Sequence, residues 1–340
     1  MAPILDRIDE EILKDTKDKL CSDFGIPEIR PFQEEAGIHI LRGRHTILDV
    51  PTGGGKTLAL WFALYYHIIS AKRLGTQSKA AVIVISPLVA LMTAQAKALN
   101  ERGIRAVALT SQIKDLVGEF KRVANGDYRV VLLGPEMQDN SDFKNIVLQS
   151  KPFLDNLIQF SVDEAHCISE WGPDFRPTYG RLIELIRRLP NTVPQLIVSA
   201  TLPKDVMDDV RLKLHLGDDF RVISVSNRKP NVALSVRTLQ HAQDSFADLV
   251  SLFPATSPES LPQTIIYVNS RTIAERMQDF LRAHAPPNLS SKAIRFYHRY
   301  LSDEEKAEIE RDLRSGILRI VIATDALGMV RLMSVPYVCV

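Results

Sequence analysis

The sequence predicts an α/β fold built on parallel sheets, and three observations support this prediction. Short apolar runs alternate along the chain with longer segments of helical spacing. The runs are apolar at nearly every position, as expected of strands whose two faces are both covered by helices. The chain has 340 residues, which indicates about two domains at ~100–200 residues per domain.

The first part of the chain supplies five of the expected strands. They are His45–Val50, Ala81–Ser86, Arg129–Gly134, Phe160–Asp163 and Gln195–Ser199. Each strand precedes a loop or a segment of helical spacing, such as Leu58–Ser70. Strands that alternate with helices in this way predict βαβ units around one parallel sheet.

A less regular stretch, Leu214–Pro262, separates this lobe from a second one. Its proline and serine content is typical of a linker or of surface loops. The alternation then resumes with strands Thr264–Val268, Ala293–Tyr297 and Leu318–Ala323 and with helices Ser270–His284 and Ser302–Ser315. The expected organisation is a first lobe over residues 1–229, a linker over 230–262 and a second lobe over 263–340.

The composition excludes several classes of protein. Lysine plus arginine number 42 and aspartate plus glutamate 41, so the net charge of +1 excludes a partner held by bulk charge alone. With 45% hydrophobic and 24% charged residues, a disordered chain is excluded as well. The three cysteines, Cys21, Cys167 and Cys339, lack the spacing of a zinc site or a disulfide framework. We expect a soluble intracellular protein, since no signal peptide or membrane-spanning run is evident.

A glycine-rich segment lies between the first strand and the helix that follows it. It reads Pro51-Thr52-Gly53-Gly54-Gly55-Lys56-Thr57. Its glycines let backbone N–H groups curl around phosphate oxygens, and the following helix adds the positive end of its dipole. Lys56 would reach the β- and γ-phosphates, and the Thr57 hydroxyl would hold Mg²⁺. Val50 stands where the strict GxxxxGK[ST] pattern has its first glycine, and the alternative is a glycine-rich turn with a chance Lys-Thr.

An acidic sequence, Val162-Asp163-Glu164-Ala165-His166, ends the fourth strand. A carboxylate at a strand end, here Asp163, can orient Mg²⁺ through water opposite Thr57, and Glu164 is then placed to polarise the attacking water. His166 could couple the nucleotide to a second site. The alternative is a solvated acidic strand end, but its position on a strand separate from the phosphate loop favours catalysis.

The acidic sequence continues into an aromatic-rich segment, and the two together resemble a known family. Residues 163–179 read Asp-Glu-Ala-His-Cys-Ile-Ser-Glu-Trp-Gly-Pro-Asp-Phe-Arg-Pro-Thr-Tyr. They resemble the RecQ family of superfamily-two DNA helicases, which carries a DEAH box that runs directly into an aromatic-rich loop. The resemblance, over roughly residues 20–329, implies two RecA-like parallel-sheet lobes, the second incomplete. It implies an ATP-dependent 3′→5′ DNA helicase with ATP and Mg²⁺ as cofactors and with single-stranded DNA and duplex junctions as partners.

Further motifs follow in the family's order. Arg30-Pro31-Phe32-Gln33 resembles the motif before the phosphate loop, which implies that Arg30 and Gln33 bind the nucleotide. The Gln33 amide would read adenine, because an amide can bond N6 and N7 together. By the same resemblance, DNA contacts are expected at Ser86, Ser270, Arg271 and Thr324, whose side chains can bond phosphates. The segments Gly134–Glu136, Ser199–Thr201, Tyr267–Arg271, Tyr297–His298 and Ala323–Met329 also match in order.

The aromatic-rich segment is the expected sensor of DNA. It holds Trp171, Phe175 and Tyr179 together with Arg176. Aromatic faces stack on unpaired bases with ~1–3 kcal/mol per base, and an arginine can bond a phosphate or stack. The resemblance implies that this segment couples DNA binding to ATP hydrolysis. The alternative is a hydrophobic plug between the lobes.

The chain departs from the family pattern after Met329. Val330 stands in place of a glycine, and no aspartate precedes Pro336. The next family motif, with its paired arginines, is absent, and an arginine finger is worth ~10³–10⁵ in rate where it has been measured in GTPases. Two function classes therefore stay open: a helicase, and an ATP- and DNA-binding fragment that cannot unwind. An RNA helicase is less favoured because RNA-directed relatives lack the Trp171–Tyr179 type of segment. A nuclear location, with a role in DNA repair and recombination, is expected from the family alone.

Overall fold

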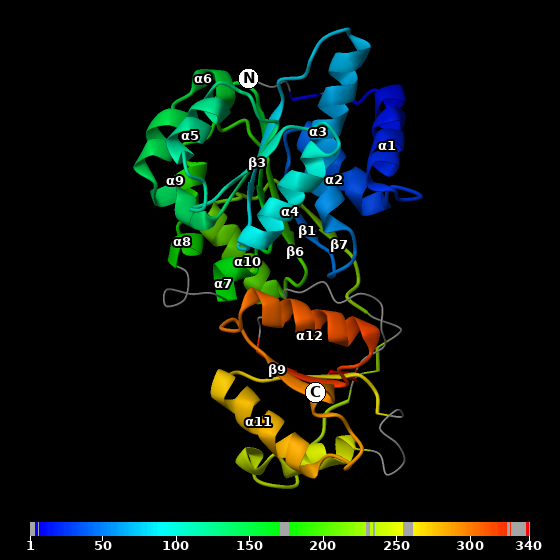
Figure 1. Ribbon diagram of the computed structural model, residues 1–340. Coiled ribbons are helices and arrows are strands. Elements are labelled where there is room, and N and C mark those ends of the chain that lie inside the picture. Colours follow the sequence, from blue (N-terminus) through cyan, green and yellow to red (C-terminus); the bar gives the residue numbers. More distant parts are fainter. Residues whose placement is uncertain are drawn as a thin grey trace. The chain divides into compact units, whose positions relative to one another are not determined.

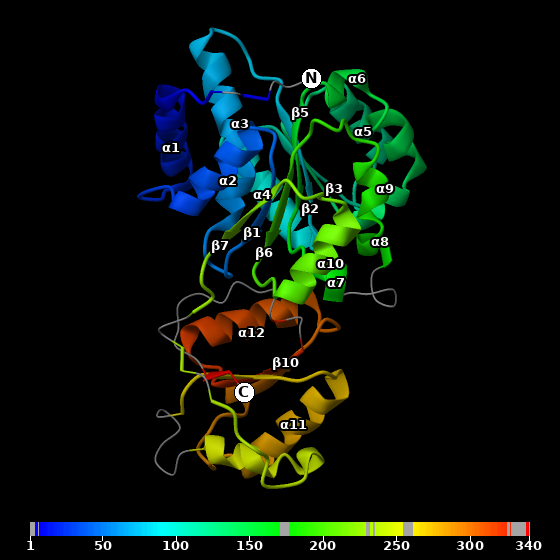
Figure 2. The same ribbon diagram turned by 180° about the vertical axis from the view of Figure 1, so that it is seen from behind.

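The computed structural model describes residues 4, 5, 7–170, 177–228, 232, 233, 235–253, 261–324, 327, 338 and 339. The chain divides into two compact units, Met1–Pro230 and Asn231–Val340, and Figures 1 and 2 show the helices and strands of each. Within the described residues, no helix is long and apolar enough to cross a membrane.

The first unit is built on a parallel sheet, to which the described residues contribute seven strands in the order β3-β4-β2-β5-β6-β1-β7. The strands are β1 (His45–Asp49), β2 (Ala81–Ile85), β3 (Ala106–Leu109), β4 (Val130–Leu133), β5 (Leu157–Val162), β6 (Gln195–Ser199) and β7 (Phe220–Ser224). The α-helices are α1 (Glu10–Phe24), α2 (Pro31–Leu41), α3 (Lys56–Arg73), α4 (Val89–Asn100), α5 (Leu116–Ala124), α6 (Lys151–Leu154), α7 (Cys167–Glu170), α8 (Pro177–Gly180), α9 (Leu182–Ile186) and α10 (Lys204–Leu214). A 3₁₀ turn covers Pro135–Asp139, and a π-helical turn covers Phe143–Val147.

Helices cover both faces of this sheet, with α1–α4 on one face and α5–α10 on the other (Figures 1 and 2). Strand β2 shows why its sequence is continuously apolar. Val82 and Val84 pack in the core beside α3, whereas Ile83 and Ile85 pack in the core beside α9 and α10. Successive side chains of a strand point to opposite faces, and here both faces are buried.

Close packing of α2 on α3 fixes the start of α2 beside the glycine-rich segment. A Cβ atom on Gly37 would lie 2.1 Å from Cδ1 of Phe62, so only glycine lets the two helices approach this closely. Phe62 is itself fully buried. The first turn of α2 carries Gln33, and α3 begins at Lys56.

The second unit holds a smaller parallel sheet with the order β11-β8-β10-β9. Its strands are β8 (Thr264–Tyr267), β9 (Ile294–Tyr297), β10 (Ile320–Ala323) and β11 (Val338–Cys339). The helix α11 (Arg271–His284) packs on the face that carries Ile266 and Ile322, and α12 (Asp303–Ser315) packs on the face that carries Ile265 and Val321. Short 3₁₀ turns cover Gln243–Ser245, Ala247–Leu252 and Ser291–Ala293.

The two sheets confirm the predicted α/β fold, but the structure corrects the prediction in two respects. Strands β3, β7 and the two-residue β11 are not among the predicted strands, and β7 lies in the stretch predicted to be irregular. All three are edge strands, and β3 and β7 have partly exposed positions, so neither of these two shows a continuous apolar run. The expected linker also contributes to a core, because Phe246, Leu249 and Leu252 pack against the core on the α11 side of the second sheet.

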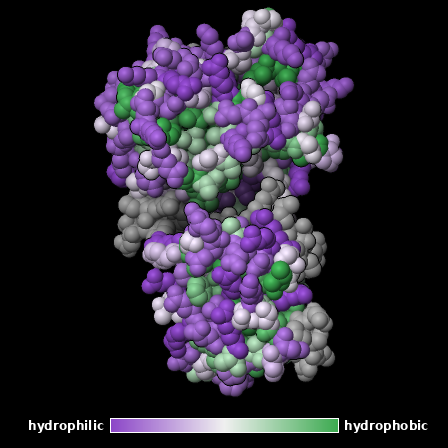
Figure 3. All heavy atoms as spheres, in the orientation of Figure 1, coloured by the Kyte–Doolittle hydropathy of each residue, from purple (hydrophilic) through white to green (hydrophobic). Residues whose placement is uncertain are grey.

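Hydrophilic residues cover most of the face shown in Figure 3, and apolar residues form smaller patches among them. The exposed large apolar side chains are spread along the described chain, from Leu74 and Leu212 to Val236 and Ile317. Scattered apolar residues of this kind are normal on a protein surface and do not by themselves indicate a binding site.

Candidate nucleotide-binding and hydrolysis site

The carboxyl ends of four adjacent parallel strands bring the predicted site residues of the first unit together. The strands lie in the order β2-β5-β6-β1. The glycine-rich segment follows β1, Ser86 follows β2, Asp163 follows β5, and Ser199 ends β6. Open α/β sheets bind their ligands at this edge, outside the carboxyl ends of the strands.

The glycine-rich segment forms a tight loop ahead of α3. Gly53 and Gly55 have φ angles of 77° and 91°, which other residues adopt only with strain. The Gly54 N–H donates to the Pro51 carbonyl over 2.9 Å. A Cβ on Gly54 would lie 2.5 Å from Cγ1 of the fully buried Val50. Valine is therefore accommodated where the strict phosphate-loop pattern has glycine, because its side chain packs beneath Gly54.

Arg30 and Gln33, the two residues before the loop that are expected to bind the nucleotide, are bonded to this loop. The Arg30 guanidinium donates to the Gly54 carbonyl over 2.8 Å, and the Gln33 amide nitrogen donates to the Gly55 carbonyl over 2.7 Å. The Gln33 amide oxygen accepts from the Arg30 N–H over 2.8 Å. Gln33 is only 2% exposed. Both ends of its amide therefore have protein partners, and Gln33 is placed to sense the conformation of the phosphate loop.

Asp163 is held in an almost fully buried position at the end of β5, where its N–H donates to the Ile85 carbonyl over 2.8 Å. Burial raises the pKa of its carboxyl to about 7, and the neighbouring charge of Glu164 adds to the rise. The Glu164 N–H, 3.0 Å from Oδ1, and the Lys56 ammonium act in the opposite direction. The Glu164 N–H and the Lys56 ammonium thus fail to offset the cost of burying the charged Asp163 carboxylate.

A divalent cation fits this carboxylate. Mg²⁺ prefers oxygen ligands, and the Asp163 carboxylate and the exposed Thr57 hydroxyl both belong to this edge of the sheet. In the part of the chain that the structure describes, no group of three or more His, Cys, Asp or Glu side chains could hold a metal ion. Magnesium commonly binds through one or two carboxylates with phosphate oxygens and water completing the shell, so Asp163 and Thr57 would hold it together with nucleotide phosphates.

Glu164 and His166 connect the acidic box to the neighbouring strand β6. The backbone of Glu164 has a φ angle of 51°. Its Oε2 atom lies 3.5 Å from Nδ1 of His166, and that same nitrogen shares a hydrogen bond of 2.9 Å with the Ser199 hydroxyl. The sequence analysis expected His166 to couple the nucleotide to a second site but did not identify its partner, which the structure shows to be the Ser199 hydroxyl.

A second buried polar contact beside the loop was missed by the sequence analysis. Asp49 ends β1 and is 9% exposed, and its Oδ2 accepts from the Ser224 hydroxyl of β7 over 3.1 Å. The only signal in the sequence was an aspartate at the end of an otherwise apolar strand. This contact ties the edge strand to a residue two positions before the phosphate loop.

An ionic network ties α10 to α7. The Lys213 ammonium donates to the Ile168 carbonyl over 3.1 Å and to Oδ2 of Asp209 over 2.7 Å. Burial acts to raise the pKa of the Asp209 carboxyl, but the hydrogen bonds from Lys213 and from the Ser169 hydroxyl outweigh it and lower that pKa. Helix α10 begins three residues after Thr201, so the network joins the chain after β6 to the chain after the acidic box.

Two of the predicted DNA contacts in the first unit are corrected by the structure. Tyr179 in α8 is 1% exposed and packs in the core with Leu182, so it is a core residue. Ser86 is fully buried, and its N–H donates to the Leu133 carbonyl over 3.1 Å. Neither side chain is on the surface for a ligand to contact. Trp171, Phe175 and Arg176 lie outside the described residues.

The predicted contacts of the second unit lie at the carboxyl ends of its strands. Ser270 follows β8 and caps α11, where its hydroxyl accepts from the Ile273 N–H over 3.5 Å. Arg271 is exposed, 4.0 Å from Oε1 of Glu275. Thr324 follows β10, and its N–H donates to the Tyr297 carbonyl over 3.1 Å. The structure brings these residues to one edge of the second sheet.

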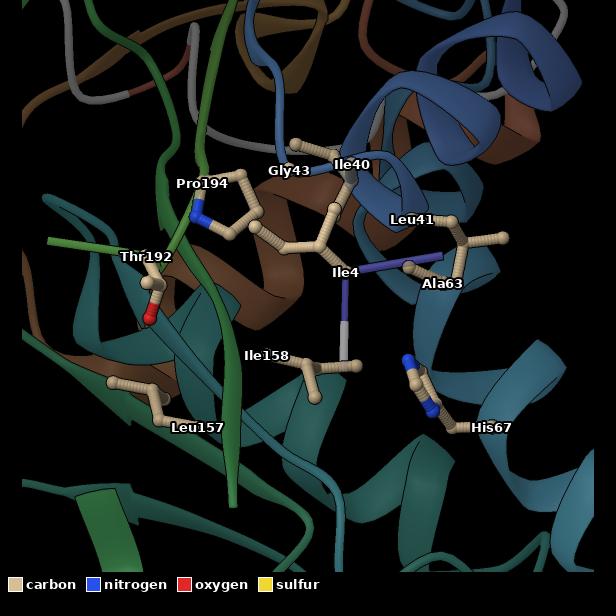
Figure 4. Close-up of a pocket in the computed structure, with 10 residues that line it drawn as sticks. All are labelled: Ile4, Ile40, Leu41, Gly43, Ala63, His67, Leu157, Ile158, Thr192 and Pro194. Atoms are coloured by element: carbon tan, nitrogen blue, oxygen red, sulfur yellow. The ribbon is translucent and has the colours of Figure 1, made fainter. Parts of the chain in front are cut away.

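A small cavity of about 20 Å³ lies at the opposite end of the first sheet from the phosphate loop. Figure 4 shows the residues that line it. Leu157 and Ile158, which begin β5, line it together with Ile40, Ala63 and the His67 ring. Burial among these side chains lowers the pKa of His67 to about 4. The cavity is too small for a nucleotide, so it belongs to the packing of the fold.

Comparison with known proteins decides the family. The DEAD/DEAH box helicase family profile matches residues 30–210, which include both the phosphate loop and the acidic box. The chain belongs to the DEAD/DEAH box helicase family. This helicase-family chain is similar to RecQ-family ATP-dependent DNA helicases, as its sequence motifs predicted.

Relatives of this helicase-family chain match most of its length. A protein named probable ATP-dependent DNA helicase RecS from Bacillus subtilis is 30% identical over 90% of this chain and 56% of its own. The ATP-dependent DNA helicase RecQ from the same organism is 29% identical over 90% of this chain and 47% of its own. The solved structure of the DUF1998 helicase MrfA bound to DNA and AMPPNP has a TM-score of 0.68 at 22% identity, covers 99% of this chain and 46% of that one, and shows the same fold. The chain thus spans about half of the length of these relatives.

Proposed function

We propose that this chain is the motor portion of an ATP-dependent DNA helicase of the RecQ type, which couples ATP hydrolysis to 3′→5′ translocation and duplex unwinding. The observation that carries the proposal is the hydrogen bond between His166 and Ser199, 2.9 Å long. It connects the acidic box to the end of β6, which lies between β5 and β1 in the sheet. A change at the hydrolysis site can therefore reach a second strand end directly.

Each residue of the site has a distinct part in the proposed hydrolysis. The N–H groups of the loop and the Lys56 ammonium bind the phosphates, while Thr57 and Asp163 hold Mg²⁺, which neutralises phosphate charge when it is bound. Glu164 polarises the attacking water and accepts its proton. His166, 3.5 Å from the Glu164 carboxylate, holds that group in place and passes its position on to Ser199.

DNA is the proposed partner, and the second unit supplies the contacts that the structure leaves accessible. Ser270, Arg271 and Thr324 would contact the backbone of one strand, since hydroxyls, guanidinium groups and backbone N–H groups all bond phosphates. The net charge of +1 agrees with a grip made of local contacts. The MrfA structure, whose title states that it is bound to DNA, supports this partner by its fold alone.

The test is an ATPase and strand-separation assay on the 340-residue chain, with single-stranded DNA as stimulus and duplexes that carry either a 3′ or a 5′ overhang. Unwinding should require the 3′ overhang. Lys56→Ala should lower the stimulated ATPase rate by about 10²–10³-fold, the cost of losing one preorganised group on the reacting charge. Lys72→Ala is the matched control, because Lys72 is exposed in the last turn of the same helix.

Two results would replace the proposal. Binding of ATP and DNA without strand separation would establish the alternative, an ATP- and DNA-binding portion that cannot unwind alone. Stronger stimulation by RNA than by DNA would make RNA the substrate. Residence in the nucleus and a role in DNA repair and recombination are part of the proposal on the strength of the RecQ resemblance, and a tagged chain excluded from the nucleus would contradict that part.

A further inference from the structure

The carboxyl edge of the second sheet holds the exposed aromatic rings of the described chain. Tyr267 ends β8 and is 41% exposed, and Tyr300, three residues past β9, is 63% exposed. Every other phenylalanine, tyrosine and tryptophan among the described residues is buried or partly buried. Since β8 and β9 both pair with β10 in parallel, the two rings share the edge that carries Ser270 and Thr324.

Two arginines converge on the Tyr300 ring. The guanidinium carbon of Arg299 lies 4.6 Å from the ring centroid, and that of Arg271, at the start of α11, lies 5.2 Å from it. The Arg299 guanidinium also donates to the Tyr300 hydroxyl. This hydrogen bond and the two positive charges lower the pKa of that hydroxyl. An exposed ring is thus surrounded by positive charge on a surface that can face solvent.

Buried contacts hold the chain segment that carries Arg299 and Tyr300. His298 is 6% exposed and stacks on Phe296, with ring centroids 5.1 Å apart and planes 14° apart. Tyr300 meets His298 edge-on, with centroids 6.2 Å apart. The Lys306 ammonium of α12 donates to the Arg299 carbonyl over 3.1 Å. The backbone is therefore held in place while the side chains of Arg299 and Tyr300 extend outward.

We propose that Tyr300 is a stacking site for one base of single-stranded DNA, with Arg271 and Arg299 contacting the flanking phosphates. The inference rests on the proposed function and adds a base contact to an edge where only backbone contacts were expected. An aromatic face flanked by cations matches an unpaired nucleotide, which offers a flat base between two negative charges. Paired bases in a duplex have no free face to offer, so the site should favour single strands.

The test compares two oligonucleotides of equal length, one of thymidines and one of abasic sugar-phosphate units, which keep the charge but lack bases. Fluorescence anisotropy of the labelled strands measures their binding to the full chain. Tyr300→Ala should weaken binding of the thymidine strand roughly ten- to a hundredfold, the usual loss for a stacked base. Tyr300→Phe keeps the ring and should bind within about threefold of the wild-type chain. On the abasic strand, Tyr300→Ala and the wild-type chain should bind alike.

A salt series tests the two arginines separately. Arg271→Gln and Arg299→Gln should each reduce the slope of log affinity against log salt concentration by about 0.7, the value for one phosphate contact on a single strand. Equal binding of the thymidine strand by Tyr300→Ala and wild type would overturn the inference and leave the proposed function intact. Equal weakening on both strands would also overturn it, because a structural defect does not distinguish bases. A wild-type chain that binds neither strand would overturn the inference and the proposed function together.

Discussion

His67 should make the stability of the first unit fall in mild acid. Its ring lies among apolar side chains of α2, α3 and β5, and burial lowers its pKa from the ordinary 6.5 to about 4 (Figure 4). At 1.36 kcal/mol per pKa unit, this difference corresponds to about 3 kcal/mol between the neutral and protonated folded states. Protonating His67 in the folded chain therefore costs about that much more than protonating it in the unfolded chain. The free energy of unfolding falls by up to this amount once the unfolded chain takes up the proton.

The direction in which stability changes with pH depends on whether the folded or the unfolded chain binds the proton at the higher pH. Above pH 6.5 both states carry a neutral His67, and its contribution is fully present. Between pH 6.5 and about 4 only the unfolded chain takes up the proton, so stability declines as the pH falls, and the loss is complete below about 4. His39 and His45, whose pKa values are also lowered by burial, act in the same direction, whereas the raised pKa of Asp163 acts against it.

The difference between the wild-type chain and His67→Gln isolates the His67 contribution, because the other titrating groups are common to both. Urea unfolding followed by tryptophan fluorescence reports on the first unit, since Trp61 and Trp171 both belong to it. The wild-type free energy of unfolding should lose about 3 kcal/mol more than that of the variant between pH 7.5 and pH 4. A constant difference across that range would refute the reasoning.

Three further predictions concern the residues around the site. Gly37→Ala should lower the free energy of unfolding by about 1–3 kcal/mol, because the new Cβ would overlap the Phe62 ring. Urea unfolding measures the loss, and adding Phe62→Leu should restore part of it. Gln33→Glu should weaken ATP binding about tenfold, because a carboxylate oxygen replaces the amide donor that bonds the Gly55 carbonyl and holds the phosphate loop; titration with a fluorescent ATP analogue checks this against the exposed neighbour variant Glu35→Gln. Ser199→Ala should lower the DNA-stimulated ATPase rate about fivefold, because His166 loses one hydrogen-bond partner, and should leave ATP affinity within about twofold. A fivefold loss of ATP affinity in the same titration would contradict the coupling role.

The strands that could be predicted from the sequence are those buried on both faces. β2 and β4 are apolar throughout because neighbouring strands and two layers of helices enclose them. β7 could not be predicted, because its Phe-Arg-Val-Ile-Ser sequence is half exposed and its strand state depends on pairing with β1. Edge strands owe their conformation to a partner that lies far away in the chain, which a local pattern does not reveal.

The candidate site also has one part that could be predicted from the sequence and another that could not. The phosphate loop and the acidic box could be predicted because phosphate binding and hydrolysis need fixed residue types at short spacing. The burial of Tyr179 and Ser86 could not, because it depends on how α8 and β2 pack against distant segments. The bond between His166 and Ser199 was also out of reach, since it joins the ends of two neighbouring strands through side chains alone.

The left-handed backbone of Glu164 sets the demands of hydrolysis against those of folding. A φ of 51° costs a residue with a Cβ about 1–2 kcal/mol that glycine would not lose. Glu164→Gly should therefore relieve the local backbone strain. The same substitution removes the carboxylate. A screen of random variants for heat resistance alone should therefore favour glycine at this position, although glycine cannot supply the carboxylate proposed to polarise the attacking water.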